Sequence, residues 1–111
     1  MDPIMKGRML MKRTVVRYKA KPEMVQENQR LIEKVFQEMN AKAPEGVRYM
    51  ALKLADGTFI HFSSAEGGDT AGPLHQIEAF KAFQSDVRQR CAEPPQSMEA
   101  TLIGHYRMLN E

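Results

Sequence analysis

The chain has 111 residues and a formal net charge of +2; 42% of its residues are apolar and 27% are charged. This is the size and composition of one ordinary globular domain, long enough to bury a core without cross-links, and it excludes a wholly disordered chain. No apolar run approaches the ~20 residues of a membrane helix, and the N-terminus lacks the apolar core of a signal peptide, so we expect neither a membrane association nor secretion.

The positive charge gathers at the N-terminus. Residues 1–13 carry four basic side chains against Asp2, a local charge of +3, so the remainder sums to −1. A nucleic-acid-binding domain would carry a basic stripe on its folded surface, so we expect no nucleic-acid partner. We expect residues 1–12 to form a flexible tail, with Met1 or Met11 as the native start, and residues 13–111 to form a single domain. The only cysteine, Cys91, excludes an internal disulfide and favours a reducing, cytoplasmic location.

The first half of the chain predicts a strand, a helix and a hairpin. Residues 14–20 (TVVRYKA) are rich in β-branched and aromatic residues, which indicates a strand. Pro22 suits the first turn of a helix, and an apolar stripe at helical spacing predicts that this helix runs over residues 23–42. Residues 47–54 and 58–64 predict two antiparallel strands, because Asp56-Gly57 between them readily forms a tight turn.

The second half predicts a loop, a helix and a last strand. Residues 65–73 are glycine-rich and lack the lysine pattern of a nucleotide-binding loop. A stripe of apolar residues from Ile77 to Cys91 predicts a helix over residues 74–91, with Cys91 as a buried thiol and the Pro94-Pro95 pair as the stop. Residues 99–108 (EATLIGHYRM) predict the last strand.

This strand-helix-strand-strand-helix-strand order predicts an α+β, ferredoxin-like βαββαβ fold. Its four-stranded antiparallel sheet would have the order 4-1-3-2, with both helices on one face. The strands nevertheless carry adjacent apolar residues, such as Val15 with Val16 and Phe59 with Ile60, so both sheet faces are apolar. A solvated face would alternate with polar residues, and we therefore expect a homodimer that covers the second face.

Over residues 12–109 the chain resembles the dimeric α/β-barrel superfamily, which includes antibiotic-biosynthesis-monooxygenase-like proteins. The element order and the stretch HFSSAEGGDTAGPLHQIEAFKAF (residues 61–83) carry the resemblance. It implies a homodimer in which two sheets face each other, and a pocket between sheet and helices in each subunit. Members include cofactor-independent oxygenases and heme-degrading enzymes. The heme-degrading members use an Asn, Trp and His trio, but this chain has no Trp and its first strand has no Asn, which argues against heme degradation.

The candidate site residues are two histidines and four aromatic residues. His61 and His75 flank the glycine-rich loop, and histidine is a general base suited to neutral pH. Tyr18 and Tyr49 can donate hydrogen bonds to a bound carbonyl, while Phe80 and Phe83 can line an apolar pocket. The spacing of His61, His75 and His105 indicates no metal site, and the sequence contains no signature for a cofactor. The sheet face that carries His61 stays open.

Three functions fit these features. The first is a cofactor-independent monooxygenase-like enzyme that acts on a small, hydrophobic, enolisable substrate. The second is a non-catalytic module that binds a small apolar ligand, and the third is a structural homodimer without a ligand. A titratable side chain that reaches into a cavity between sheet and helices would favour the first.

Overall fold

The computed structural model describes residues 11–66 and 71–109. Most of the predicted tail and the centre of the glycine-rich loop lie outside these residues. The elements follow in this order: β1 (Lys12–Ala20), the 3₁₀ turn η1 (Pro22–Met24), α2 (Val25–Lys42), β2 (Val47–Lys53), β3 (Thr58–Ala65), α3 (Ala71–Leu74), α4 (Glu78–Ser85), the 3₁₀ turn η3 (Val87–Arg90) and β4 (Cys91–Ala100).

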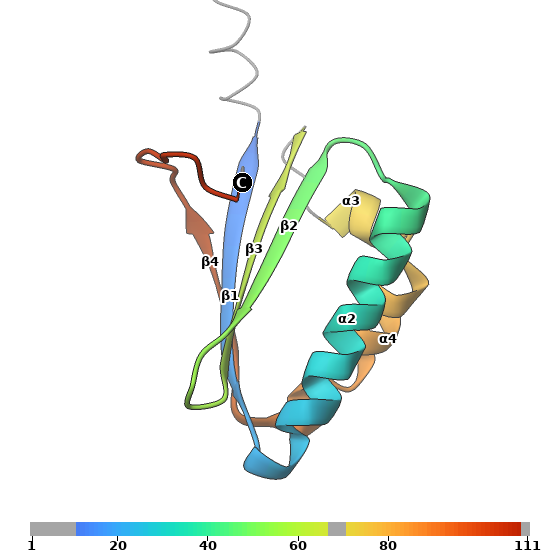
Figure 1. Cartoon of the computed structure of the whole chain (residues 1–111), viewed down its shortest axis with the longest axis vertical. Coiled ribbons are helices and arrows are strands. Elements are labelled where there is room, and N and C mark those ends of the chain that lie inside the picture. Colours follow the sequence, from blue (N-terminus) through green and yellow to red (C-terminus); the bar gives the residue numbers. More distant parts are fainter. Residues whose placement is uncertain (1–10, 67–70, 110–111) are drawn as a thin grey trace, which may run out of the picture.

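The four strands form one antiparallel sheet in the order β2-β3-β1-β4, which confirms the predicted topology. Figure 1 shows α2 and α4 side by side on one face of this sheet. The hairpin turns where predicted, and Gly57 adopts a φ of +86° there. The α+β ferredoxin-like fold expected from the sequence is therefore the observed one.

The core lies between the sheet and the two helices. Buried aromatic rings from the central strands, Tyr18 and Phe59, stack with their centroids 5.5 Å apart. Buried residues of α2 and α4, among them Val35, Phe80 and Phe83, pack against the same cluster. Each large apolar side chain buried in this way contributes roughly 1.5–3 kcal/mol, so the helix-facing side of the sheet holds the fold together.

The second helix is shorter than its apolar stripe suggested. The predicted helix over 74–91 is wrong in extent, because the segment divides into α3, α4 and the turn η3. Asp86 leaves helical geometry at a φ of −120° and a ψ of 11°. Cys91 is not a helical residue but the first residue of β4, and it is half-buried.

The last strand also lies earlier than predicted. β4 covers Cys91–Ala100, whereas residues 101–109 lie outside the sheet and are exposed. Pro94 and Pro95 do not stop the segment: they fall within β4, at the shift in register between the partners of Arg17 and Lys19. Because β4 is an edge strand, a residue without an N–H is tolerated there.

The sheet face opposite the helices carries an apolar row that the helices do not cover. Strand register aligns Met98, Val15, Phe62 and Met50 in one row across this face. Phe62 is 40% exposed and Met98 is 71% exposed. Residues 101–109 leave β4 on the side away from the helices (Figure 1), and they help to line a hollow of about 810 Å³ over the same face. We call this surface the outer face.

Candidate functional site

A cavity of about 240 Å³ lies between the sheet and the α4 segment. All six candidate residues from the sequence analysis line it: His61, His75, Tyr18, Tyr49, Phe80 and Phe83. The remaining wall is made of four apolar residues, Val16, Leu74, Val87 and Pro95, and four polar ones, Thr14, Ser63, Gln84 and Ser97. The volume is slightly below the ~300–1,000 Å³ typical of small-molecule sites, which favours a small ligand.

Strand parity brings the polar side chains together. Alternate residues of a strand point to the same face, so Tyr18 of β1, Tyr49 of β2 and His61 of β3 all face the helices. The face of His61, which the sequence left open, is thus the helix-facing one. His61 pairs with Val16 on one side and with Ala51 on the other, in the centre of the sheet.

The His61 ring sits between two tyrosine hydroxyls. Its Nε2 atom lies 2.9 Å from the Tyr18 hydroxyl, and its Nδ1 atom lies 2.5 Å from the Tyr49 hydroxyl. Both pairs of atoms are within hydrogen-bonding distance, and the contact with Tyr49 is the shorter one. Because both ring nitrogens are engaged, His61 has no free nitrogen to offer a ligand directly while these bonds are made.

Burial keeps all three groups of this trio neutral. His61 is only 4% exposed, and burial lowers the pKa of its imidazole from 6.5 to about 4. Burial also raises the pKa of the Tyr18 hydroxyl, and burial together with the nearby Tyr18 raises the pKa of Tyr49. At neutral pH the trio is therefore an uncharged imidazole between two protonated hydroxyls, since desolvation disfavours each charged form.

Two further residues, Asn28 and Arg90, belong to the network and were not among the candidates from the sequence. The Asn28 amide nitrogen donates to the Tyr18 hydroxyl at 2.8 Å, and the Asn28 oxygen accepts from Arg90 Nε at 2.9 Å. Arg90 also donates to the Phe83 carbonyl oxygen at 2.8 Å, and its guanidinium lies 5.0 Å from the centre of the Phe83 ring. Asn28 is fully buried and Arg90 is 3% exposed. A polar residue on the predicted apolar side of α2 was the one available hint.

His75 and Thr14 occupy other parts of the wall. His75 follows α3 and is exposed, so it meets both the cavity and solvent. The Thr14 hydroxyl oxygen is buried, and no described residue hydrogen-bonds to it. Thr14 lines the cavity, and its hydroxyl is an exception to the rule that buried polar groups are paired.

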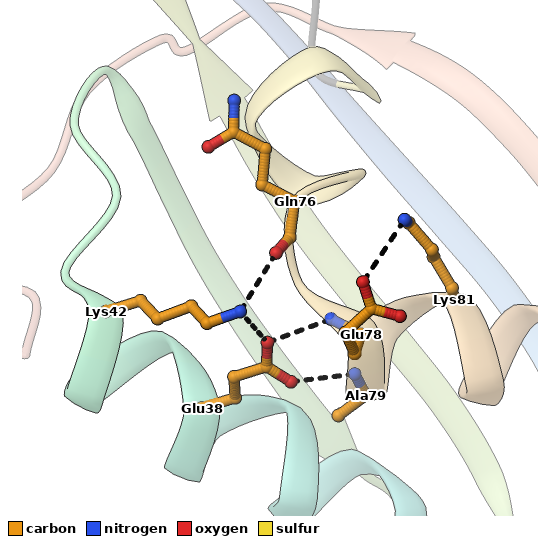
Figure 2. Close-up of polar contacts among 6 residues, drawn as sticks. All are labelled: Glu38, Lys42, Gln76, Glu78, Ala79 and Lys81. Atoms are coloured by element: carbon orange, nitrogen blue, oxygen red, sulfur yellow. Dashed lines mark hydrogen bonds and ion pairs between the residues drawn. The ribbon is translucent and has the colours of Figure 1, made fainter.

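The helix that carries Phe80 and Phe83 is held by a carboxylate from α2. Figure 2 shows the Glu38 side chain pointing at the start of α4, where its two oxygens accept from the backbone N–H groups of Glu78 at 2.9 Å and Ala79 at 2.8 Å. Lys42 Nζ lies 2.6 Å from the same carboxylate and also donates to the Gln76 carbonyl oxygen. These bonds satisfy helix N-terminal donors that otherwise lack partners.

The described residues hold no group of three metal-ligating side chains. No helix in residues 11–66 and 71–109 is long and apolar enough to span a membrane. His105, the third histidine, lies outside the sheet in the exposed segment 101–109, so it is not on a strand as predicted and does not line the cavity.

Solved structures of other proteins have the same fold as this chain. A candidate antibiotic biosynthesis monooxygenase from Nitrosomonas europaea matches with a TM-score of 0.68 and 14% identity, over 85% of this chain and 91% of that one. A conserved protein from Methanosarcina mazei Go1 matches with a TM-score of 0.70 and 16% identity, over 86% and 96%. No family model and no curated protein sequence matches the chain. The chain thus has the fold of solved structures that are named as antibiotic biosynthesis monooxygenases, as the sequence resemblance implied.

Proposed function

We propose that this protein is a cofactor-independent, monooxygenase-like enzyme for a small, hydrophobic, enolisable substrate. The cavity carries the proposal: its wall is mostly apolar, yet two histidines and two tyrosines converge on it. An apolar pocket with a few converging polar groups is the usual form of a small-molecule site. Several solved structures of the same fold have names that refer to antibiotic biosynthesis monooxygenases, which supports the same class.

The chemistry follows from the groups on the wall. A base removes a proton from a carbon next to the substrate carbonyl, and the resulting carbanion reduces O₂ to form a hydroperoxide at that carbon. Loss of water leaves a second carbonyl, so one CH₂ and one O₂ give one C=O and one H₂O. We assign the proton removal to His75, because both nitrogens of His61 are engaged by tyrosines. His61 would then act through its tyrosine partners.

We also propose that the protein works as a homodimer joined through the outer face. The apolar row of Val15, Phe62, Met50 and Met98 has no cover from the helices. In the adjoining segment 101–109, Ile103 is 99% exposed and Tyr106 is 81% exposed. Contiguous apolar surface of this kind marks an interaction site, and a second copy offers a matching surface.

The lone cysteine supports a cytoplasmic location.

The test uses 2-tetralone, an apolar two-ring ketone with an enolisable CH₂, under air. We expect protein-dependent O₂ uptake with formation of the dione, and faster exchange of the C1 protons in D₂O. His75→Ala should reduce both rates by about 10²–10⁴-fold, the usual contribution of a general base. The matched control is His105→Ala, because His105 is exposed outside the cavity.

The outcomes separate the candidate functions. Equal rates for His75→Ala and the wild type would remove His75 from the mechanism. Binding of 2-tetralone without exchange or O₂ uptake would replace the enzyme by a ligand-binding protein, a function that the neutral, fully engaged His61 already favours. If 2-tetralone does not bind at all, the third function, a structural homodimer without a ligand, is favoured.

A further inference from the structure

The hydrogen bonds around His61 form a chain with a definite direction. We call the series Arg90, Asn28, Tyr18, His61 and Tyr49 the polar chain. Arginine can only donate hydrogen bonds, so the Asn28 atom 2.9 Å from Arg90 Nε must be the amide oxygen. The other end of the amide is then its NH₂ group, which donates to the Tyr18 oxygen at 2.8 Å.

This direction passes through the Tyr18 hydroxyl. The hydroxyl has one hydrogen to donate and already accepts from Asn28. It is buried, and among the described residues its only other partner is His61 Nε2, at 2.9 Å. Its hydrogen must therefore point to Nε2, since buried polar hydrogens are almost always paired. A neutral imidazole that accepts at Nε2 carries its own hydrogen on Nδ1.

The direction ends at Tyr49. The Nδ1 hydrogen of His61 points to the Tyr49 oxygen, 2.5 Å away. Tyr49 then accepts from His61, and the hydrogen of its own hydroxyl is free for another acceptor. No described residue takes that hydrogen, and Tyr49 lines the cavity.

We propose that Tyr49 is the residue that contacts the ligand, as a hydrogen-bond donor to a ligand oxygen. Arg90, Asn28, Tyr18 and His61 are positioning residues that fix the direction of this donor. The ligand class is therefore a compound with an acceptor oxygen, a carbonyl that becomes an enolate, rather than a ligand that donates at this point. The ligand part of this inference rests on the proposed function, whereas the direction of the chain does not.

The charge of the polar chain fits the same ligand. Arg90 is buried, and no carboxylate of the described residues forms an ion pair with it. Its partners are the neutral oxygens of Asn28 and Phe83. A buried cation at one end of a series of aligned donors favours negative charge at the other end, as in sites that stabilise an oxyanion.

The tautomer of His61 tests the direction without any ligand. We expect ¹⁵N-detected NMR of the imidazole to show the hydrogen on Nδ1. Asn28→Asp replaces the NH₂ donor with an acceptor of the same shape, so the Tyr18 hydrogen should turn to it and the His61 hydrogen should move to Nε2. Asn40→Asp makes the same change at an exposed position of α2 and should leave the Nδ1 form unchanged. A wild-type imidazole with its hydrogen on Nε2 would overturn the proposal, and this holds even if Asn28→Asp does not fold.

The donor role of Tyr49 is tested with 2-tetralone and tetralin, which differ by one carbonyl oxygen. We expect the wild type to bind 2-tetralone about tenfold more tightly than tetralin, the ratio that one hydrogen bond provides. Tyr49→Phe should bind the two compounds equally. A preference retained in Tyr49→Phe overturns the donor role. If the preference is lost as expected but the wild type consumes no O₂, the oxygenase function fails while the assignment of Tyr49 stands.

Discussion

Glu38 of α2 caps Ala79 of α4: its Oε1 atom accepts from the Ala79 backbone N–H at 2.8 Å. The same carboxylate accepts from the preceding backbone N–H, as Figure 2 shows. Because α4 carries Phe80 and Phe83, this cap fixes one wall of the cavity to the other helix. The relationship joins residues 41 positions apart, and no local sequence pattern announces it.

The cap predicts a stability loss in strong acid. The Lys42 ammonium and the two α4 amides lower the pKa of the Glu38 carboxyl from 4.5 to about 2. A depressed carboxyl pKa means that the stabilisation is fully present above pH 4.5 and is lost as the pH falls toward about 2. Glu38→Gln should therefore be less stable than the wild type at pH 7 and should lose less on acidification over this window. Thermal unfolding at several pH values measures this.

The control for this prediction is Glu33→Gln, an exposed carboxylate on the same helix. Its stability should follow the wild type at every pH. Parallel pH curves for Glu38→Gln and the wild type would show that the carboxylate does not hold α4 by its charge.

The burial of His61 predicts a second loss of stability, at a less acidic pH than the loss expected from Glu38. Burial lowers the pKa of its imidazole from 6.5 to about 4, so over this window the unfolded chain binds a proton that the folded chain does not. As the pH is lowered through this window, the free energy of unfolding should decrease, by at most about 1.4 kcal/mol per pH unit. His61→Gln should flatten this window, whereas His105→Gln, at an exposed position, should not. A His61 resonance that titrates near 6.5 in NMR would contradict the prediction.

The outer face predicts the association state. Static light scattering at micromolar concentration should give twice the 12.7 kDa of one chain. Phe62→Lys places a charge in the centre of the apolar row and should yield monomers, because an unpaired charge is costly to bury. Gln26→Lys, on the exposed surface of α2, should remain dimeric. A monomeric wild type would leave the apolar row without the proposed partner.

The sequence predicted the elements whose patterns are local. A run of β-branched and aromatic residues located β1, and the Asp56-Gly57 pair located the hairpin of β2 and β3. These elements carry Tyr18, Tyr49 and His61, so these residues of the cavity wall could also be named from the sequence. The pocket between sheet and helices was expected from the family resemblance.

The predicted position of the last strand was wrong because two local sequence patterns each indicated the wrong structure. Pro94 and Pro95 indicated a stop, yet they lie on an edge strand at a register shift, where the missing N–H costs little. The apolar residues Leu102 and Ile103 indicated a strand, yet they lie in the exposed segment 101–109. Their apolar character requires burial that one chain does not supply, and the proposed dimer would provide it.

Asn28 and Arg90 were missed for a different reason. They lie 62 positions apart, and each is an ordinary polar residue in its own segment. Only the packing of η3 against α2 makes them partners of each other and of Tyr18. A buried polar chain of this kind is a tertiary property, because each member is tolerated only when all the others are in place.

This dependence predicts a large effect of Arg90→Met, which keeps a long side chain but removes its donors. The oxygen of Asn28 and the carbonyl oxygen of Phe83 would both lose a buried partner, at about 1–3 kcal/mol for each. The Asn28 amide would also be free to turn over, so the His61 hydrogen should no longer stay on one nitrogen. Arg88→Met, at an exposed position of the same 3₁₀ turn, should change stability by no more than about 0.5 kcal/mol. Urea unfolding of the two variants, together with the imidazole ¹⁵N spectrum, decides the matter: if Arg90→Met is as stable as Arg88→Met and keeps a single His61 tautomer, Arg90 does not direct the polar chain.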